Sequence, residues 1–187
     1  MDFTDKVVLV TGSSRGIGAG IVRAFAAAGA RCVVNYVADQ AGRNRADAEE
    51  VAAAAGGAAV VECDVADHAR VGEMMRGIVE RHGGLDILVN NAGILRDRTL
   101  RKMTAEDFDA VVRVNLGGAF NTLQHAATLL RGGGRVVNVA SVAAFTGFFG
   151  QANYASAKGG LVALTKVAAR EFARQGTTVN CVAPGFV

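Results

Sequence analysis

The chain has 187 residues, of which 51% are hydrophobic and 20% are charged, and its formal net charge is +3. This length suits one domain with a full hydrophobic core, and this composition excludes a disordered chain. The weak charge and scattered arginines do not indicate nucleic-acid binding, and no apolar run is long enough to span a membrane. We expect a single soluble domain over residues 1–187, without nucleic-acid or membrane partners.

The amino terminus and the cysteines indicate the compartment. Residues 1–6 lack the basic and then apolar pattern of a secretory signal. Cys32, Cys63 and Cys181 each lie in an apolar segment, their number is odd, and their spacing matches no metal-binding pattern. The sequence therefore predicts buried free thiols, a reducing cytoplasm and no metal site.

Short apolar segments alternate with amphipathic segments along the whole chain. Apolar runs rich in β-branched residues predict six buried strands, over residues 6–11, 31–36, 58–63, 85–89, 135–140 and 177–183. Apolar residues at helical spacing predict helices, over about 17–29, 39–55, 67–82, 104–130 and 151–172. This alternation predicts an α/β fold with a doubly wound parallel sheet, a Rossmann fold, whose ligand lies at the carboxyl ends of the strands.

Polar residues mark the expected helix starts. Asp67 and Thr104 are predicted to cap the helices that follow them, and Asp39 is interpreted as the cap of the second helix. In the first helix, an apolar stripe is expected to face the core. The stripe consists of Ile17, Ile21, Phe25 and Ala28.

A glycine-rich loop joins the first strand to the first helix. It reads Gly12-Ser13-Ser14-Arg15-Gly16-Ile17-Gly18. Backbone N–H groups and the helix dipole at such a junction favour a bound phosphate. Gly12 allows a tight turn, and Gly16 and Gly18 allow close approach of the backbone. The segment predicts a dinucleotide-binding loop, although a simple turn with a helix cap is the alternative.

The end of the second strand bears on the choice of cofactor. An acidic residue there binds the ribose of NAD, whereas an arginine nearby accepts the extra phosphate of NADP. This chain has Asn35 and Tyr36 at that position and Arg15 in the glycine loop. Asp39 is close enough to be a rival ribose ligand. The sequence favours NADP(H) and leaves NAD(H) possible.

Three further strand ends carry candidate cofactor contacts. Asp64 and Val65 follow the third strand, and Asp64 could accept a hydrogen bond from adenine or cap the next helix. Asn91-Ala92-Gly93 follows the fourth strand, where small residues leave room for a cofactor and an asparagine can brace the neighbouring strand. Pro184 and Gly185 follow the sixth strand.

A serine, a tyrosine and a lysine converge near the fifth strand. Ser141 ends that strand, and Tyr154 and Lys158 are four residues apart, which places them on one helix face. A neighbouring ammonium favours an ionised phenol, so the tyrosine can exchange a proton with an alcohol or carbonyl oxygen. Asn115 lies among apolar residues and must be hydrogen-bonded, either as a structural tether or as part of the site.

Together these motifs resemble the short-chain dehydrogenase/reductase family. The resemblance rests on residues 11–18, 64–65 and 90–93, on Asn115, Ser141, Tyr154 and Lys158, and on residues 184–185. It implies that Tyr154 is the acid/base, that Ser141 orients the substrate oxygen, and that Asn115 holds a water in a proton relay. It also implies that Lys158 binds the nicotinamide ribose. The implied cofactor contacts include Tyr36, Tyr154, Lys158 and Val187.

Within the family, residues 91–97 are similar to 3-oxoacyl-[acyl-carrier-protein] and acetoacetyl-CoA reductases. The resemblance implies reduction of a 3-oxoacyl thioester in fatty acid biosynthesis, with acyl carrier protein or CoA as a partner. It also implies a homodimer or homotetramer that packs through residues 115–130 and 151–174. The sequence departs from the family pattern at two points. The chain stops at Val187, which suggests a truncated domain without the family's seventh strand and lid. Gln175 also stands where acyl-carrier reductases often carry a basic residue.

Three alternatives stay open. One is a family member that acts on another alcohol or ketone. Another is a nucleotide-binding module without turnover. The third is a sugar-nucleotide epimerase, which would need a larger carboxyl-terminal substrate region.

Overall fold

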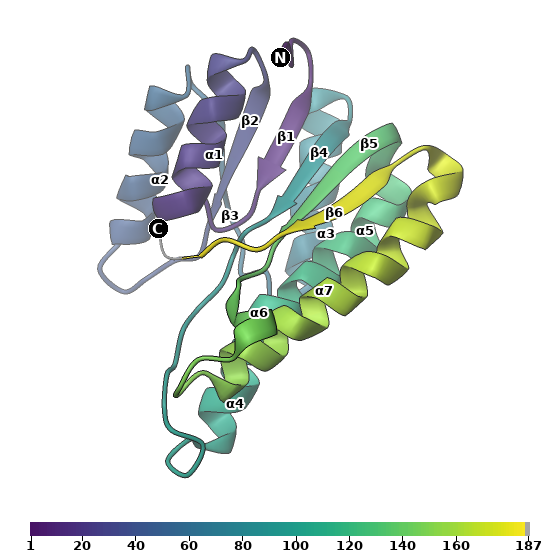
Figure 1. Ribbon diagram of the computed structural model, residues 1–187. Coiled ribbons are helices and arrows are strands. Elements are labelled where there is room, and N and C mark those ends of the chain that lie inside the picture. The colour runs from purple at the N-terminus through teal and green to yellow at the C-terminus, as the bar shows by residue number, and fades with distance from the viewer. Residues whose placement is uncertain (186–187) are drawn as a thin grey trace.

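The computed structural model describes residues 1–185, so Val187, one of the predicted cofactor contacts, lies outside the described residues. Six parallel strands form one sheet in the order β3-β2-β1-β4-β5-β6 (Figure 1). The strands are β1 Val7–Val10, β2 Arg31–Tyr36, β3 Ala59–Glu62, β4 Leu85–Asn90, β5 Leu130–Val139 and β6 Thr178–Val182. The predicted doubly wound parallel sheet is confirmed.

Helices cover both faces of the sheet (Figure 1). They are α1 Gly16–Ala27, α2 Arg43–Ala54, α3 His68–His82, α4 Ala105–Val112, α5 Gly118–Leu129, α6 Ala143–Thr146 and α7 Ala152–Phe172, with a 3₁₀ turn at Ala173–Gln175. Side chains of a strand alternate between the two faces. Val8 and Val10 therefore pack with α1 and α2, whereas Val7 and Leu9 pack with α3, α5 and α7.

The stripe predicted for α1 is confirmed in part. Ile21 and Phe25 pack against the core beside the buried residues Gly18, Ala19 and Val22, but Ile17 is 42% exposed. Gly18 and Ala19 are small, so the helix can approach the sheet and the glycine loop closely. Ile17 lies instead over the cavities at the carboxyl ends of the strands.

The helix predicted over 104–130 is interrupted by a π-helical segment at Arg113–Gly117, between α4 and α5. Such segments carry one extra residue per turn and occur often at functional sites. Asn115 lies in this segment. The apolar pattern of the sequence did not reveal this interruption, because apolar residues continue through the π-helical segment.

The capping predictions have different outcomes. Asp67 accepts a hydrogen bond from Arg70 N (3.1 Å), and Thr104 accepts one from Asp107 N (3.1 Å), so both caps are confirmed. Helix α2 begins at Arg43, after Gly42 in a left-handed conformation (φ 68°), and not at Asp39. Asp39 still accepts a hydrogen bond from Asn44 N (2.8 Å), so it serves the first turn from outside the helix.

Two of the three free cysteines are fully buried. Burial raises the pKa of Cys32 and that of Cys63 to about 11 each, which keeps both as thiols near neutral pH. Cys181 is only partly buried, because β6 is an edge strand, so the expectation of three buried thiols is wrong for it. In residues 1–185, no helix is both long and apolar enough to cross a bilayer.

Candidate active site

Two cavities adjoin at the carboxyl ends of the strands. The larger, about 610 Å³, lies beside the glycine loop and the ends of β2 and β3, and the smaller, about 270 Å³, lies beside the ends of β5 and β6. Ile17, Asn91, Gly93 and Ile94 line both. The two cavities therefore form one continuous crevice where a doubly wound sheet is expected to bind its ligand.

Close backbone contacts shape the glycine loop. Gly12 has a φ of 60°, and a Cβ added to it would lie 2.7 Å from Ala92 Cα. A Cβ added to Gly18 would lie 2.6 Å from Asn91 Nδ2. That amide donates to Thr11 O and Gly12 O, each at 3.0 Å. Asn91 thus braces the neighbouring strand as predicted. Gly12 and Gly18 leave no room for a side chain, whereas a Cβ added to Gly16 would have no protein atom within 4 Å, so the close approach predicted at Gly16 is not seen.

The start of α1 suits a phosphate. Its amino terminus has no side-chain cap, and its first turn holds no acidic residue. The first N–H groups of a helix lack partners within the helix, and the dipole there favours an anion. Ser14 and Arg15 line the larger cavity beside this terminus. The residues present therefore fit the diphosphate of a dinucleotide.

Asn35 holds the loop from the neighbouring strand, a role that the sequence did not indicate. Its Oδ1 accepts from Gly12 N (3.0 Å), and its Nδ2 donates to Cys63 O (3.1 Å). Ser13 is fully buried, and its hydroxyl donates to Val10 O (2.7 Å), so it shapes the loop and lines neither cavity. A lone polar residue within a buried strand is the signal that could have identified Asn35.

The predicted adenosine contacts surround the larger cavity. Tyr36, Asp64 and Val65 all line it. The Tyr36 hydroxyl donates to Glu62 Oε2 (3.2 Å), and Asp64 Oδ1 accepts from Ala66 N (2.9 Å). Asp64 thus supports its own turn and remains exposed to the cavity.

Arg15 is engaged by two residues of α2. Its Nη2 donates to Asn44 Oδ1 and lies 3.2 Å from Asp47 Oδ2. The sequence placed Arg15 in the cofactor site but did not indicate these partners, because they come from a helix almost thirty positions away.

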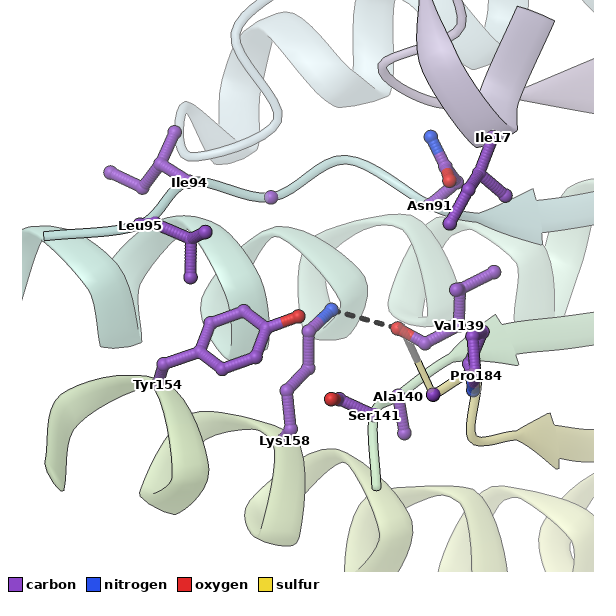
Figure 2. Close-up of a pocket in the computed structure, with 12 residues that line it drawn as sticks. Ile17, Asn91, Ile94, Leu95, Val139, Ala140, Ser141, Tyr154, Lys158 and Pro184 are labelled. Atoms are coloured by element: carbon purple, nitrogen blue, oxygen red, sulfur yellow. Dashed lines mark hydrogen bonds between the residues drawn. The ribbon is translucent and has the colours of Figure 1, made fainter. Parts of the chain in front are cut away.

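Ser141, Tyr154 and Lys158 line the smaller cavity together (Figure 2). Ser141 lies just beyond β5, and the other two project from α7. The Tyr154 hydroxyl points toward the Lys158 amine, which lies 5.6 Å from the centre of the tyrosine ring. Ala143 N donates to Ser141 Oγ (3.2 Å), which leaves the hydroxyl proton available for a substrate oxygen.

Lys158 is buried almost completely, with 4% of its surface exposed. Its Nζ donates to Val139 O (2.7 Å). Burial disfavours the charged ammonium and lowers the pKa of Lys158 to about 8. A basic group that titrates near neutral pH inside a cavity is typical of an active site.

Asn115 tethers the segment that forms one wall of the crevice. Its Oδ1 accepts from Ile94 N (2.7 Å), its Nδ2 donates to Ile94 O (3.0 Å), and only 1% of its surface is exposed. The sequence left open whether Asn115 is a structural tether or part of the site, and these hydrogen bonds match a tether. Its side chain lies behind Gly93, since a Cβ there would be 3.3 Å from Asn115 Oδ1.

Asn153 is a second buried amide that the sequence did not single out. It is fully buried, and its Nδ2 donates to Arg96 O (2.9 Å) and Asp107 O (3.2 Å). Its Oδ1 accepts from Tyr154 N (2.8 Å). Asn153 thus joins the segment after β4 to the helix that carries Tyr154. Pro184 and Gly185 complete the smaller cavity.

The profile of the family described as short chain dehydrogenase matches residues 6–187. The chain belongs to the short chain dehydrogenase family. A 3-oxoacyl-[acyl-carrier-protein] reductase of Synechocystis is 42% identical over 98% of this chain and 75% of its own length. The enzyme FabG of Staphylococcus aureus, with the same activity in its name, is 43% identical over 97% of this chain and 74% of its own length.

Solved structures agree with this assignment. A short chain dehydrogenase from Burkholderia cenocepacia in complex with NADP has a TM-score of 0.91 and 37% identity, over 99% of this chain and 76% of its own. One from Mycobacterium avium has a TM-score of 0.89 and 39% identity, over 99% of this chain and 69% of its own. This short chain dehydrogenase is an oxidoreductase. Within residues 1–185, no group of three His, Cys, Asp or Glu side chains lies close enough together to hold a metal ion.

Proposed function

We propose that this short chain dehydrogenase reduces a 3-oxoacyl thioester to the 3-hydroxyacyl form with NADPH. One observation carries the proposal: Ser141, Tyr154 and Lys158 share a cavity that opens into the cleft beside the glycine loop. Relatives named 3-oxoacyl-[acyl-carrier-protein] reductase support the substrate class. A structural neighbour with bound NADP and the cation Arg15 at the cleft support the cofactor.

The residues of the smaller cavity can complete the reduction of a carbonyl group. The bound cofactor would supply a hydride to the carbonyl carbon. Tyr154 donates its phenolic proton to the carbonyl oxygen, which becomes the hydroxyl of the product. Ser141 donates a hydrogen bond to the same oxygen and holds it in place. The ammonium of Lys158 stabilises the phenolate that proton donation leaves behind and binds the nicotinamide ribose.

The contacts around this cavity assign supporting roles to other residues. Asn115 and Asn153 fix the wall segment at two points, through the backbone of Ile94 and of Arg96. The family resemblance adds that Asn115 holds a water in a proton relay. The cofactor would lie along Gly12, Ser14, Ile17 and the ends of β3 and β4, where Asp64, Val65, Ala92 and Gly93 border the larger cavity.

The carrier of the acyl group is either acyl carrier protein or CoA. Gln175 stands where carrier-protein reductases often have a basic residue, and Arg174 is beside it. A family member that acts on another ketone is the second candidate. Initial rates with an acetoacetyl thioester of each carrier and with simple ketones would rank these substrates.

We also propose a homo-oligomer that packs through α5 and α7. Phe120 is 46% exposed, and it borders an apolar hollow of about 460 Å³ with Leu116 and Leu164. Exposed apolar hollows of this kind mark contact surfaces. A molar mass in solution equal to that of one chain would contradict this arrangement.

Tyr154→Phe tests the reaction directly. The change removes the proton donor and keeps the ring, so turnover with NADPH and a 3-oxoacyl thioester should fall about 10²–10⁴-fold. The dissociation constant for NADPH should change little, because the larger cavity is untouched. Turnover close to that of the parent protein would contradict the assignment of Tyr154.

A further inference from the structure

Arg15 lies where two hollows meet. It lines the cofactor cleft and a second hollow, about 440 Å³, between α1 and α2. Asp47 and Glu50 of α2 line the second hollow as well. Among residues 1–185, Arg15 is the single cationic side chain that lines the larger cavity. An extra negative charge on the part of a cofactor that lies in this cavity would therefore face this guanidinium.

Two residues of α2 hold Arg15 in its present position. Asn44 accepts a hydrogen bond from Arg15 Nη2, and the Asp47 carboxylate lies 3.2 Å from the same nitrogen. Asn44 is itself held, because its Nδ2 donates to Val37 O (2.9 Å) and its backbone N–H donates to Asp39 Oδ1 (2.8 Å). The guanidinium is thus shared between a neutral amide and a carboxylate.

These two partners differ in their effect on an incoming phosphate. A ribose 2′-phosphate carries nearly two negative charges near neutral pH and only accepts hydrogen bonds. The guanidinium has five donors, so it can bind the phosphate and still donate to the Asn44 amide. The Asp47 carboxylate competes for the same charge and repels the phosphate. NADH has a hydroxyl at this position and is not subject to that competition.

We propose that Asp47 is a specificity-determining residue, which competes with the cofactor's 2′-phosphate for Arg15 and so limits the preference for NADPH over NADH. This inference rests on the proposed use of NADPH. The side chains of Arg15 and Asp47 are 61% and 42% exposed, and exposed ion pairs are weak. Asp47 therefore moderates the preference and does not reverse it.

The test is a titration of the whole chain with each reduced cofactor. The chain has no tryptophan, so the nicotinamide fluorescence can be followed directly. Asp47→Asn should tighten NADPH binding about two- to fivefold, the range of one exposed ion pair, and leave NADH binding unchanged. Glu50→Gln is the matched control, since it removes one negative charge from the same helix and hollow, and within residues 1–185 Glu50 forms no ion pair with Arg15. It should change neither constant.

A double-mutant cycle separates competition at Arg15 from a general charge effect. Arg15→Gln should weaken NADPH binding, and in that background Asp47→Asn should bring no further gain. A gain that persists without Arg15, an equal gain from Glu50→Gln, or weaker NADPH binding by Asp47→Asn would each overturn the inference. If the parent chain prefers NADH or binds neither cofactor, the proposed function fails. If it prefers NADPH and Asp47→Asn has no effect, only this inference fails.

Discussion

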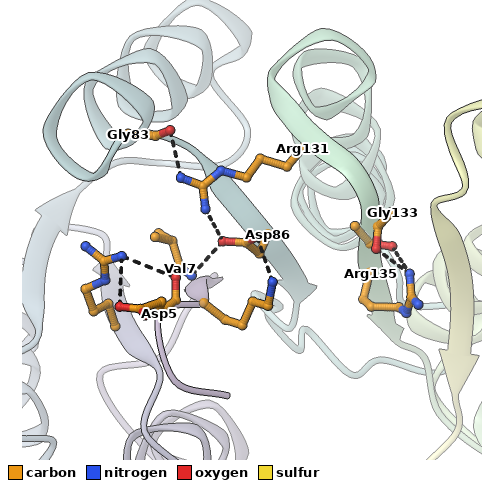
Figure 3. Close-up of polar contacts among 10 residues, drawn as sticks. Asp5, Val7, Gly83, Asp86, Arg131, Gly133 and Arg135 are labelled. Atoms are coloured by element: carbon orange, nitrogen blue, oxygen red, sulfur yellow. Dashed lines mark hydrogen bonds and ion pairs between the residues drawn. The ribbon is translucent and has the colours of Figure 1, made fainter. Parts of the chain in front are cut away.

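The two ends of the parallel sheet both gather charged side chains, but they use them differently. At the amino ends, Asp86 Oδ2 accepts hydrogen bonds from Val7 N (2.9 Å) and Arg131 Nη1 (2.7 Å), and Lys6 Nζ lies 3.7 Å from Asp86 Oδ1 (Figure 3). Arg131 also donates to Gly83 O (2.8 Å). Each charge in this cluster has a partner of opposite charge or a backbone partner.

At the carboxyl ends, the buried charge has little compensation. The Lys158 ammonium donates to one carbonyl oxygen, and burial lowers its pKa to about 8. Its neighbours Ser141 and Tyr154 face a cavity. A cluster of charges marks a site only when some of its polar groups are left to face open space. The amino-end cluster stabilises the fold, and the carboxyl-end cluster is available for chemistry.

The largest effect that separates the two ends is expected for Lys158→Met. Loss of the ammonium removes the stabilisation of the phenolate, so turnover should fall about 10²-fold or more. The free energy of unfolding should not fall, because an apolar side chain of similar length has no charge to bury. Urea unfolding and initial rates on the same preparation check both statements. A strongly destabilised variant would show that Lys158 is structural, like Asp86.

The next effect is the dependence on pH. The folded-state pKa of Lys158, about 8, is below its ordinary value of 10.5. Below about pH 8 the ammonium is present, so kcat/KM for reduction should be level there and fall by up to about tenfold per pH unit above it. The unfolded chain keeps this proton up to its ordinary pKa, so the free energy of unfolding should rise between pH 8 and 10.5.

Lys158→Met supplies the control for that pH dependence. In the variant, the rise in the free energy of unfolding over this window should be absent, since the group that titrates has been removed. A rise of the same size in the variant would assign the effect to other groups.

The smallest effects are expected at the amino end. Asp86→Ala leaves Val7 N–H without its acceptor and Arg131 without its carboxylate, which should lower the free energy of unfolding by about 1–3 kcal/mol. Turnover should be unchanged. Lys6→Gln is the matched control, since its side chain is 54% exposed and its loss should cost about 0–1 kcal/mol. A loss of turnover in Asp86→Ala, with an unchanged free energy of unfolding, would contradict a purely stabilising role for the amino-end cluster.

Local patterns predicted most of the fold. The six strands were recognised from apolar runs, and Asp67 and Thr104 were recognised as caps, because both signals depend on residues close in the chain. The start of β5 was missed: Leu130 pairs with Leu85, and the register shifts before Arg135 pairs with Ile87. That irregularity brings Arg131 to Asp86, a contact between distant segments that no local pattern shows.

The site was predictable as a set of residues but not as a set of contacts. Ser141, Tyr154 and Lys158 were named from spacing, and the structure brings them to one cavity. The tethering contacts of Asn35 and Asn153 were not predicted, since a buried asparagine gives no sign of which backbone groups it will meet. The Asp47 contact with Arg15 was missed for a related reason, because surface charges on a helix usually face solvent.

The π-helical segment at Arg113–Gly117 changes the phase of the long helix that surrounds it. Before it, α4 packs mainly on α7, and after it, α5 packs mainly on α3. One residue turns an α-helix by about 100°, so an extra residue in this turn lets one continuous helix present two differently directed faces. A deletion of one residue here would rotate all of α5 against α3 and withdraw Asn115 from Ile94 at the same time. The length of this turn, as much as its composition, therefore holds the wall of the crevice in place.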